Sequence, residues 1–149
     1  MDSIRLPARL ESIAKARTFI QNKMSGRNLD ARLVGRVELA LEEALVNISR
    51  YAYPNYEGKV EIHFGLGDES QVYLEIHDWG IPFNPLKHER PEPGQNLFFR
   101  RVGGWGVVMI REMADYLNYA RTQGKNILSL EFIPRETKLP EPREPEPIR

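Results

Sequence analysis

Three short segments of the chain carry the residue types that a nucleotide site needs. Glu43 and Asn47 lie in a run of apolar periodicity, Asp78 and Gly80 close an alternating run, and Gly103-Gly-Trp-Gly106 opens another apolar run. The first segment offers a carboxylate for an attacking hydroxyl and an amide for a metal ion. The second offers an acid for the edge of a nucleotide base, and the third offers backbone amides for phosphates. Each segment alone is a weak signal, but their order and spacing together favour nucleotide binding.

The first segment places two polar side chains on one face of a predicted helix. Glu43 and Asn47 are four residues apart, so they can converge on one ligand. Glu43 could accept a hydroxyl proton, and Asn47 could offer an oxygen to Mg²⁺. The alternative is a solvated charged face, because Arg36 and Arg50 point in roughly the same direction as Glu43. Taken alone, these residues favour that alternative.

The second segment ends a predicted strand with an acid. Asp78 follows the apolar Val72, Leu74 and Ile76, and an acid at that place needs a donor, for which the exocyclic amine of adenine is one candidate. Gly80 would let a flat base approach the backbone closely. The alternative is an aspartate that bonds its own turn, which is common before glycine.

The third segment feeds the N-terminus of a predicted helix. Exposed amides and the helix dipole favour an anion there, such as a phosphate chain, and Arg100 and Arg101 could add charge-assisted contacts. A glycine loop is more often a simple turn. Here it follows residues 84–102, which we expect to form a loop that closes over a ligand. It is not a Walker loop, because no Gly-Lys-Ser/Thr follows.

The elements that position these residues follow from the spacing of apolar side chains. The predicted helices cover residues 9–24, 30–53 and 104–115, the predicted strands cover residues 59–64, 71–77, 116–122 and 127–133, and turns are expected at residues 65–69 and 124–126. Their order predicts an α+β fold with helices on one face of a mixed or antiparallel sheet. His63 and His77 fall on strand faces, where structural histidines are more common than metal ligands.

Composition limits the class of protein. The 149 residues suit one domain, which we expect to cover residues 1–134, followed by a disordered tail rich in Pro, Glu and Arg at residues 135–149. The 21 basic and 21 acidic side chains cancel, which argues against a direct nucleic-acid partner. The chain has no cysteine and no apolar run of the roughly 20 residues that span a bilayer, and its first residues lack the basic region and apolar stretch of a signal peptide. We therefore expect a cytoplasmic protein without a membrane partner.

Together the three segments resemble those of the GHKL ATPase superfamily, and within it the stand-alone anti-sigma-factor serine/threonine kinases of bacterial stress and sporulation switches. The similarity runs from about Ile4 to Ile133. Residues 43–47 resemble the N-box of that family, residues 78–85 its first glycine box and residues 103–106 its second. The form Asp-x-Gly-x-Pro-Phe-x-Pro is the most specific of the three. It favours this subfamily over sensor histidine kinases.

The resemblance implies roles for individual residues near the metal and the base. Glu43 would be the catalytic base and Asn47 the Mg²⁺ ligand. Asp78 would accept the adenine amine, with Gly80 beside it. The implied fold is a two-layer α/β sandwich of the GHKL/histidine-kinase-ATPase type, with helices on one face of a mixed, mostly antiparallel sheet.

Further residues complete the expected ATP site. Gly104 and Gly106 would be phosphate-loop positions, and the loop over residues 84–102 would be a short ATP lid. We include Arg101 for its charge, and Asn126 because it stands near the adenine, where the family often carries threonine. Asparagine can still donate and accept hydrogen bonds. A second departure is Arg50, which stands where such proteins often have histidine.

The implied reaction is transfer of the γ-phosphoryl group of Mg·ATP to a serine or threonine of a STAS-domain antagonist protein. A sigma factor would be the alternative partner, ADP the product, and a homodimer a possible assembly. One alternative is a non-catalytic, ATP-dependent binding module that sequesters a regulatory partner. The catalytic half of a histidine kinase is disfavoured, because nothing before Arg9 could hold a dimerisation helix pair. An α/β domain without a nucleotide remains the plainest alternative.

Overall fold

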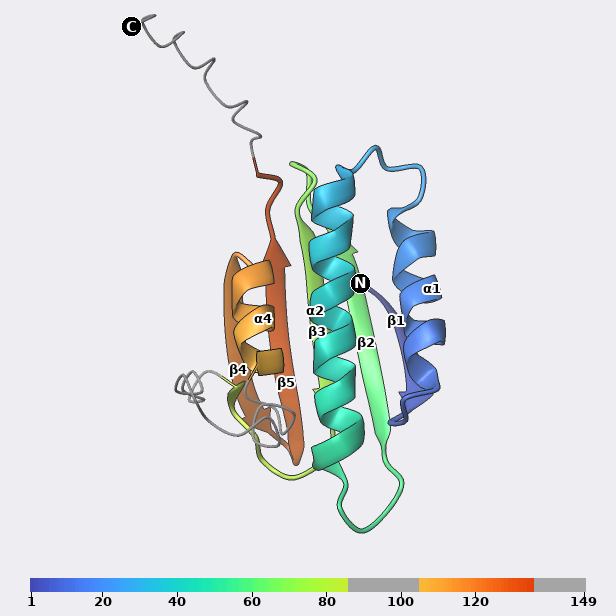
Figure 1. The fold of residues 1–149 in the computed structure, drawn as a ribbon, viewed down its shortest axis with the longest axis vertical. Helices are drawn as coiled ribbons and strands as arrows, with labels where there is room; N and C mark the ends of the chain where they lie inside the picture. Colours follow the sequence, from blue (N-terminus) through green and yellow to red (C-terminus); the bar gives the residue numbers. More distant parts are fainter. Residues whose placement is uncertain (86–104, 136–149) are drawn as a thin grey trace, which may run out of the picture.

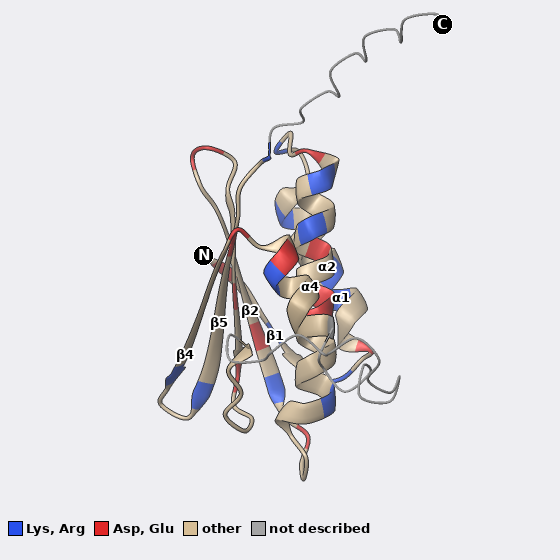
Figure 2. Ribbon diagram, turned by 60° about the vertical axis from the view of Figure 1, so that its left-hand side comes forward, with Lys and Arg blue, Asp and Glu red and all other residues tan. Residues whose placement is uncertain are grey.

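The structure is a computed structural model that describes residues 1–85 and 105–135, arranged in two layers (Figure 1). One layer is a five-stranded sheet of order β1-β2-β3-β5-β4, and the helices form the other layer on a single face of it (Figure 2). The strands are β1 (Asp2–Pro7), β2 (Lys59–Leu66), β3 (Val72–Asp78), β4 (Tyr116–Thr122) and β5 (Lys125–Phe132). The helices are α1 (Ser12–Met24), α2 (Ala31–Asn47), the π-helical turn η1 (Ile48–Ala52) and α4 (Trp105–Met113).

This arrangement confirms the predicted two-layer α+β fold. Every strand pairing in the described part of the chain is antiparallel, so the sheet is not mixed there. The predicted lid beyond Pro85 and the predicted tail beyond Arg135 lie outside the described residues. No helix within residues 1–85 and 105–135 is both long and apolar enough to cross a membrane.

Strand β1 is an element that the sequence prediction missed. Only Ile4 and Leu6 alternate in it, and a run with two apolar residues is too short to be recognised as a strand. Both side chains face the helices, with Ile4 opposite Ile62 of β2. The strand lies at the sheet edge and ends at Pro7, a position where a missing amide proton costs no ladder hydrogen bond.

Helix α2 crosses the middle of the sheet and carries part of the site. Its N-cap is Asp30, as predicted, and the side chain of Asp30 accepts from the amide of Arg32 at 2.9 Å. The predicted helix to residue 53 instead changes to the wider π-helical turn at Ile48. There the Ser49 hydroxyl donates to the carbonyl of Leu45 at 2.6 Å, which competes with the regular helical pattern.

The core lies between the two layers. The sheet contributes fully buried side chains from each central strand, and the helices contribute the apolar faces of α1 and α2. Its largest fully buried members are Ile20, Leu33, Leu41, Ile62, Leu74, Ile76, Ile110 and Phe132. Burial of each such side chain stabilises the fold by roughly 1.5–3 kcal/mol, and this rigid core fixes α2 relative to β3 and β5.

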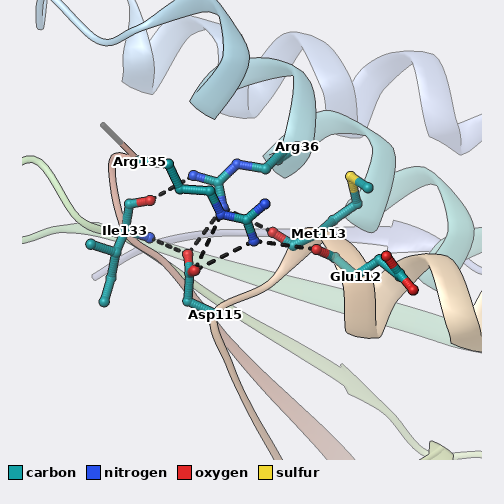
Figure 3. A network of polar contacts seen from close by, with 6 residues as sticks. All are labelled: Arg36, Glu112, Met113, Asp115, Ile133 and Arg135. Atoms are coloured by element: carbon teal, nitrogen blue, oxygen red, sulfur yellow. Dashed lines mark hydrogen bonds and ion pairs between the residues drawn. The ribbon is translucent and has the colours of Figure 1, made fainter. Parts of the chain in front are cut away.

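A buried arginine joins three elements at the end of α4 that lies away from Gly106 (Figure 3). The guanidinium of Arg36 donates to the carbonyl of Met113 at 3.1 Å, to Asp115 Oδ2 at 3.0 Å and to the carbonyl of Ile133 at 2.6 Å. Arg36 is only 9% exposed. The suggestion that Arg36 shares a solvated face with Glu43 is therefore wrong.

The turn between β4 and β5 lies at Gln123 and Gly124, both of which have positive φ. Asn126 is consequently the second residue of β5, directly opposite Asp78 of β3. The sequence prediction of a turn over residues 124–126 is wrong by about two residues. The pairing of β3 with β5, which local sequence does not reveal, places Asn126 beside the acid.

Candidate functional site

Glu43 and Asn47 face the N-terminal end of α4. A Cβ atom added to Gly106 would lie 2.9 Å from Glu43 Oε2 and 3.4 Å from Asn47 Nδ2. The bare Cα of Gly106 therefore leaves the space in which the carboxylate and the amide stand. The structure brings together three of the predicted site residues, two from α2 and one from α4.

The Glu43 carboxyl group is half-buried, and this changes its acidity. Burial raises the pKa of Glu43, the neighbouring charge of Glu42 raises it further, and the charge of Arg50 opposes both. Within the described part of the chain, neither Glu43 nor Asn47 makes a side-chain hydrogen bond. A carboxylate with increased proton affinity and no internal partner is suited to act as a general base.

Asp78 is buried at the end of β3, with 6% of its surface exposed. Its Oδ1 accepts from the amide of Gly80 at 3.0 Å and from Asn126 Nδ2 at 2.9 Å. Among the residues that the structure describes, none donates to Oδ2. Burial raises the pKa of Asp78, while the hydrogen bonds from Asn126 and Gly80 lower it. One oxygen is thus fixed, and the other remains an acceptor for an external donor.

Asn126 uses its whole amide within the protein. Besides its bond to Asp78, Nδ2 donates to the carbonyl of Ile81 at 2.9 Å. Its Oδ1 accepts from the Tyr119 hydroxyl at 2.5 Å and from the amide of Phe83 at 3.4 Å. Asn126 therefore braces Asp78 and the segment after it. Tyr119 was not predicted as a site residue, because only the β4–β5 register places it here.

Gly80 is required by the packing of the chain itself. A Cβ atom at this position would lie 2.3 Å from the carbonyl oxygen of Ala52, the last residue of η1. The amide of Ile81 donates to the same oxygen at 2.9 Å, and Arg121 donates to the carbonyl of Gly80 at 2.8 Å. This close approach holds the segment after Asp78 against the end of η1. The predicted approach of a base to Gly80 stays a prediction.

A narrow cavity of about 40 Å³ connects the two parts of the site. Asn47 and Ile48 line it from the helix layer, and Tyr119 and Asn126 line it from the sheet, with Phe83 at its side. This leaves room for a few water molecules, because about 10–15 Å³ of such space suffices for one. The cavity thus lies between Asn47 of the helix face and Asn126, which holds Asp78, although a purine requires the cavity to widen.

Two of the predicted phosphate-site residues, Arg101 and Gly104, lie outside the described residues. The described part of the third segment is Gly106 with the helix that follows it. Arg111 of α4 donates to the carbonyl of Pro85 at 3.1 Å, and this contact holds the start of the predicted lid.

The two-layer sandwich, with a cavity between its helix layer and its sheet, defines the class of protein as an α/β domain with a binding site between the layers. Residues 6–132 match the model of the histidine kinase-like ATPase domain, and the chain belongs to that family. The match covers both layers of the fold and every described site residue, which confirms the family that the three segments indicated.

Curated relatives of similar length carry the name serine-protein kinase RsbW. The protein of Bacillus thuringiensis (strain Al Hakam) is 25% identical over 140 residues, which cover 89% of this chain and 85% of the relative. The protein of Staphylococcus epidermidis is 26% identical over 139 residues, which cover 89% of this chain and 87% of the relative.

Solved structures share the fold. The structure of the RsbU and RsbW domains of Rv1364c from Mycobacterium tuberculosis has a TM-score of 0.59 and 12% identity, and the match covers 89% of this chain and 32% of that one. The blue-light activated histidine kinase EL346 of Erythrobacter litoralis has a TM-score of 0.54 and 19% identity, with coverage of 83% and 40%. The chain therefore corresponds to less than half of each of these larger proteins.

Proposed function

We propose that this protein is an ATP-dependent serine/threonine protein kinase that acts as an anti-sigma factor in a partner-switching system. The names and coverage of the RsbW relatives support this class of activity. The observation that carries the proposal is the convergence of Glu43, Asn47 and Gly106 beside a cavity that reaches Asn126.

The described residues fit Mg·ATP in their donor and acceptor chemistry. Oδ2 of the buried Asp78 has no donor within the described chain, and the adenine amine supplies one. Asn47 offers an amide oxygen for Mg²⁺, and the N-terminal end of α4 at Gly106 favours phosphate. When bound, Mg·ATP supplies the transferable γ-phosphoryl group and the charge that neutralises it.

The protein groups then have separate tasks. Glu43 accepts the proton of the acceptor hydroxyl, and the raised pKa makes this carboxylate a better base. Asp78 selects a base that donates at its edge, while Asn126 holds Asp78 in place. Gly106 leaves room for the Glu43 carboxylate beside α4. This division predicts that binding and proton transfer can be disturbed separately.

The proposed acceptor is a serine or threonine of a STAS-domain antagonist, and the alternative partner is a sigma factor. If the two partners bind the kinase in mutually exclusive ways, the bound nucleotide (ATP or its transfer product ADP) and phosphorylation of the antagonist would control which partner is bound. This choice of partners rests on the similarity to the RsbW kinases. The particular partner requires a binding screen.

Two substitutions and a matched control test the site. Glu43→Gln should keep the affinity for Mg·ATP and reduce phosphoryl transfer by about 10²–10⁴-fold, the usual contribution of a general base. Asn47→Ala should weaken Mg·ATP binding itself. Glu38→Gln is the control, since Glu38 lies on the same helix as Glu43 but accepts a hydrogen bond from Gln21 at 2.8 Å, away from the site. Titration calorimetry measures binding, and radiolabelled ATP with a panel of STAS-domain proteins measures transfer.

The possible outcomes separate the enzyme from a binding module. Wild-type transfer rates in Glu43→Gln would contradict the role of Glu43 as base. ATP binding by the wild-type protein, without phosphorylation of any STAS-domain protein that it binds, would favour the non-catalytic module. Absence of ATP binding would contradict both.

A further inference from the structure

The sheet carries a second group of polar side chains on the face away from the helices. Glu61 and His63 lie on β2, and Glu75 and His77 lie on β3. Their neighbours along each strand, including Ile62 and Ile76, are buried in the core against the helices. Because side chains alternate along a strand, these four residues share the opposite face, which no described helix covers (Figure 2).

The register of β2 and β3 makes this group compact. Glu61 lies directly opposite His77, and His63 lies directly opposite Glu75. Each acid is therefore flanked by a histidine both along its own strand and across the strand pair. Opposite residues on one face of an antiparallel pair have Cβ atoms about 4.5–5.5 Å apart, which is close enough for their side chains to share a ligand.

The distances confirm that the ligating atoms face one another. His63 Nε2 lies 2.6 Å from Glu61 Oε1, and the rings of His63 and His77 lie 4.4 Å apart between centroids. One ligating atom from each of Glu61, His63 and His77 falls within 4.8 Å of the other two. Glu75 Oε1 lies 3.4 Å from His77 Nε2 and stands at the fourth corner.

We propose that Glu61, His63 and His77 form a binding site for a divalent transition-metal ion of the zinc type. Two imidazoles and one carboxylate are a donor set that holds Zn²⁺ in proteins, with a fourth position for water or, here, for Glu75. Metal–ligand bonds of about 2.0–2.2 Å place tetrahedral ligand atoms roughly 3.3 Å apart. The Glu61–His63 pair needs to open by less than about 1 Å, as the metal replaces the proton that the pair now shares.

The surroundings hold two of the ligands ready. Arg5 donates to Glu61 Oε2 at 2.7 and 3.0 Å, which leaves Oε1 directed toward His63. Such a second partner orients a ligating carboxylate. His77 is 7% exposed, so its neighbours restrict the orientation of its ring.

Lys125 competes with the metal for His77, and this competition gives the proposal a specific test. Its Nζ lies 3.2 Å from His77 Nδ1, so the ammonium group favours the ring tautomer with its proton on Nε2. Nε2 is the nitrogen on the side of Glu75 and therefore of His63, so the metal must take that position. Binding moves the ring proton to Nδ1 and displaces the lysine. Removal of the Lys125 charge should therefore strengthen metal binding.

The test is a titration of the full-length protein with Co²⁺ and then Zn²⁺ in the absence of nucleotide. The visible absorption of Co²⁺ reports imidazole and carboxylate coordination, and calorimetry with Zn²⁺ gives affinity and stoichiometry. We expect one ion per chain. His63→Gln and Glu61→Gln should each weaken binding by about 10–100-fold or more, and Lys125→Met should strengthen it several-fold.

The control is His88→Gln, which removes the remaining histidine of the chain and should leave the affinity unchanged. Circular dichroism and thermal unfolding establish that each variant is folded, and the partly exposed Glu61 and His63 provide two independent variants. Failure of the wild-type protein to bind either ion would overturn the proposal. So would equal affinity in wild type, His63→Gln and Glu61→Gln, or a loss in His88→Gln as large as in His63→Gln.

This metal site does not depend on the proposed kinase activity. The cluster lies on the sheet face opposite to α2 and α4, whereas Glu43 and Asn47 belong to the helix layer. ATP binding in the His63→Gln variant should therefore equal that of the wild type. A protein that binds ATP but no Zn²⁺ would refute only the metal site, and the reverse result would refute only the nucleotide site.

Discussion

Asp78→Asn separates the stability of the fold from nucleotide recognition. The substitution keeps the shape of the side chain, and its remaining oxygen can still accept from Gly80 and Asn126. The atom that changes is Oδ2, an acceptor oxygen that the substitution replaces with an amide NH₂ group, which donates. If that oxygen accepts the adenine amine, the variant places two donors against each other.

The expected loss of affinity follows from that change. A hydrogen bond to a charged group contributes about 1.5–3 kcal/mol, so ATP should bind roughly 10- to 150-fold more weakly to Asp78→Asn. The free energy of unfolding, in contrast, should not decrease in this variant. Because burial raises the pKa of Asp78, its contribution to stability is present below the ordinary aspartate pKa and is lost as pH rises through the raised value. At pH 7 the variant should be at least as stable as the wild type.

Calorimetric titration with Mg·ATP measures the first effect, and urea unfolding at pH 7 measures the second. The matched control is Glu75→Gln, which neutralises an acid on the same strand but on the opposite face of the sheet. Its ATP affinity should equal that of the wild type in a buffer that contains Mg²⁺ as the sole divalent ion. An unchanged ATP affinity in Asp78→Asn would refute the role of Asp78 in base recognition.

Four further substitutions have distinct expected outcomes. Gly106→Ala should change the unfolding free energy by less than about 1 kcal/mol, yet reduce phosphoryl transfer in a radiolabel assay, because its Cβ displaces the flexible Glu43 carboxylate. Gly80→Ala should cost about 1–3 kcal/mol in urea unfolding, because its Cβ meets backbone. Arg36→Met should lower the unfolding free energy by about 1.5–3 kcal/mol, and an unchanged urea midpoint would contradict the network. Burial raises the pKa of Asp115, but the hydrogen bonds from Ile133 and Arg36 outweigh burial, so the pKa is lowered overall. The free energy of unfolding of the wild type should therefore fall as the pH drops below about 4. In Asp115→Asn it should fall less steeply over the same pH range.

The periodic elements of the fold could be predicted because their signals are local. The 3.6-residue stripe that includes Val37 and Leu41 indicated α2, and the alternation around Ile62 and Ile76 indicated β2 and β3. The π-helical turn left no such signal, because the side-chain bond of Ser49 rather than apolar spacing accompanies the change of pitch.

The site was predictable where its members are neighbours in sequence. The spacing of Glu43 and Asn47 sufficed to place both on one helix face, and the structure adds Gly106 opposite them. The brace from Asn126 to Asp78 could not be predicted, because it depends on the pairing of β3 with β5 across 48 residues. The roles of these residues toward ATP stay predictions.

The position of the Arg36 network has a mechanical consequence for α4. The helix is pinned near Met113, while Gly106 lies seven residues away, a distance of about 10 Å along the axis. A small displacement of the glycine end must then be a tilt about a fixed pivot, and a shift of about 1 Å at Gly106 corresponds to roughly 5°. The sheet beyond the pivot need not follow, so the entrance of the helix can adjust while the far end of the molecule keeps its shape.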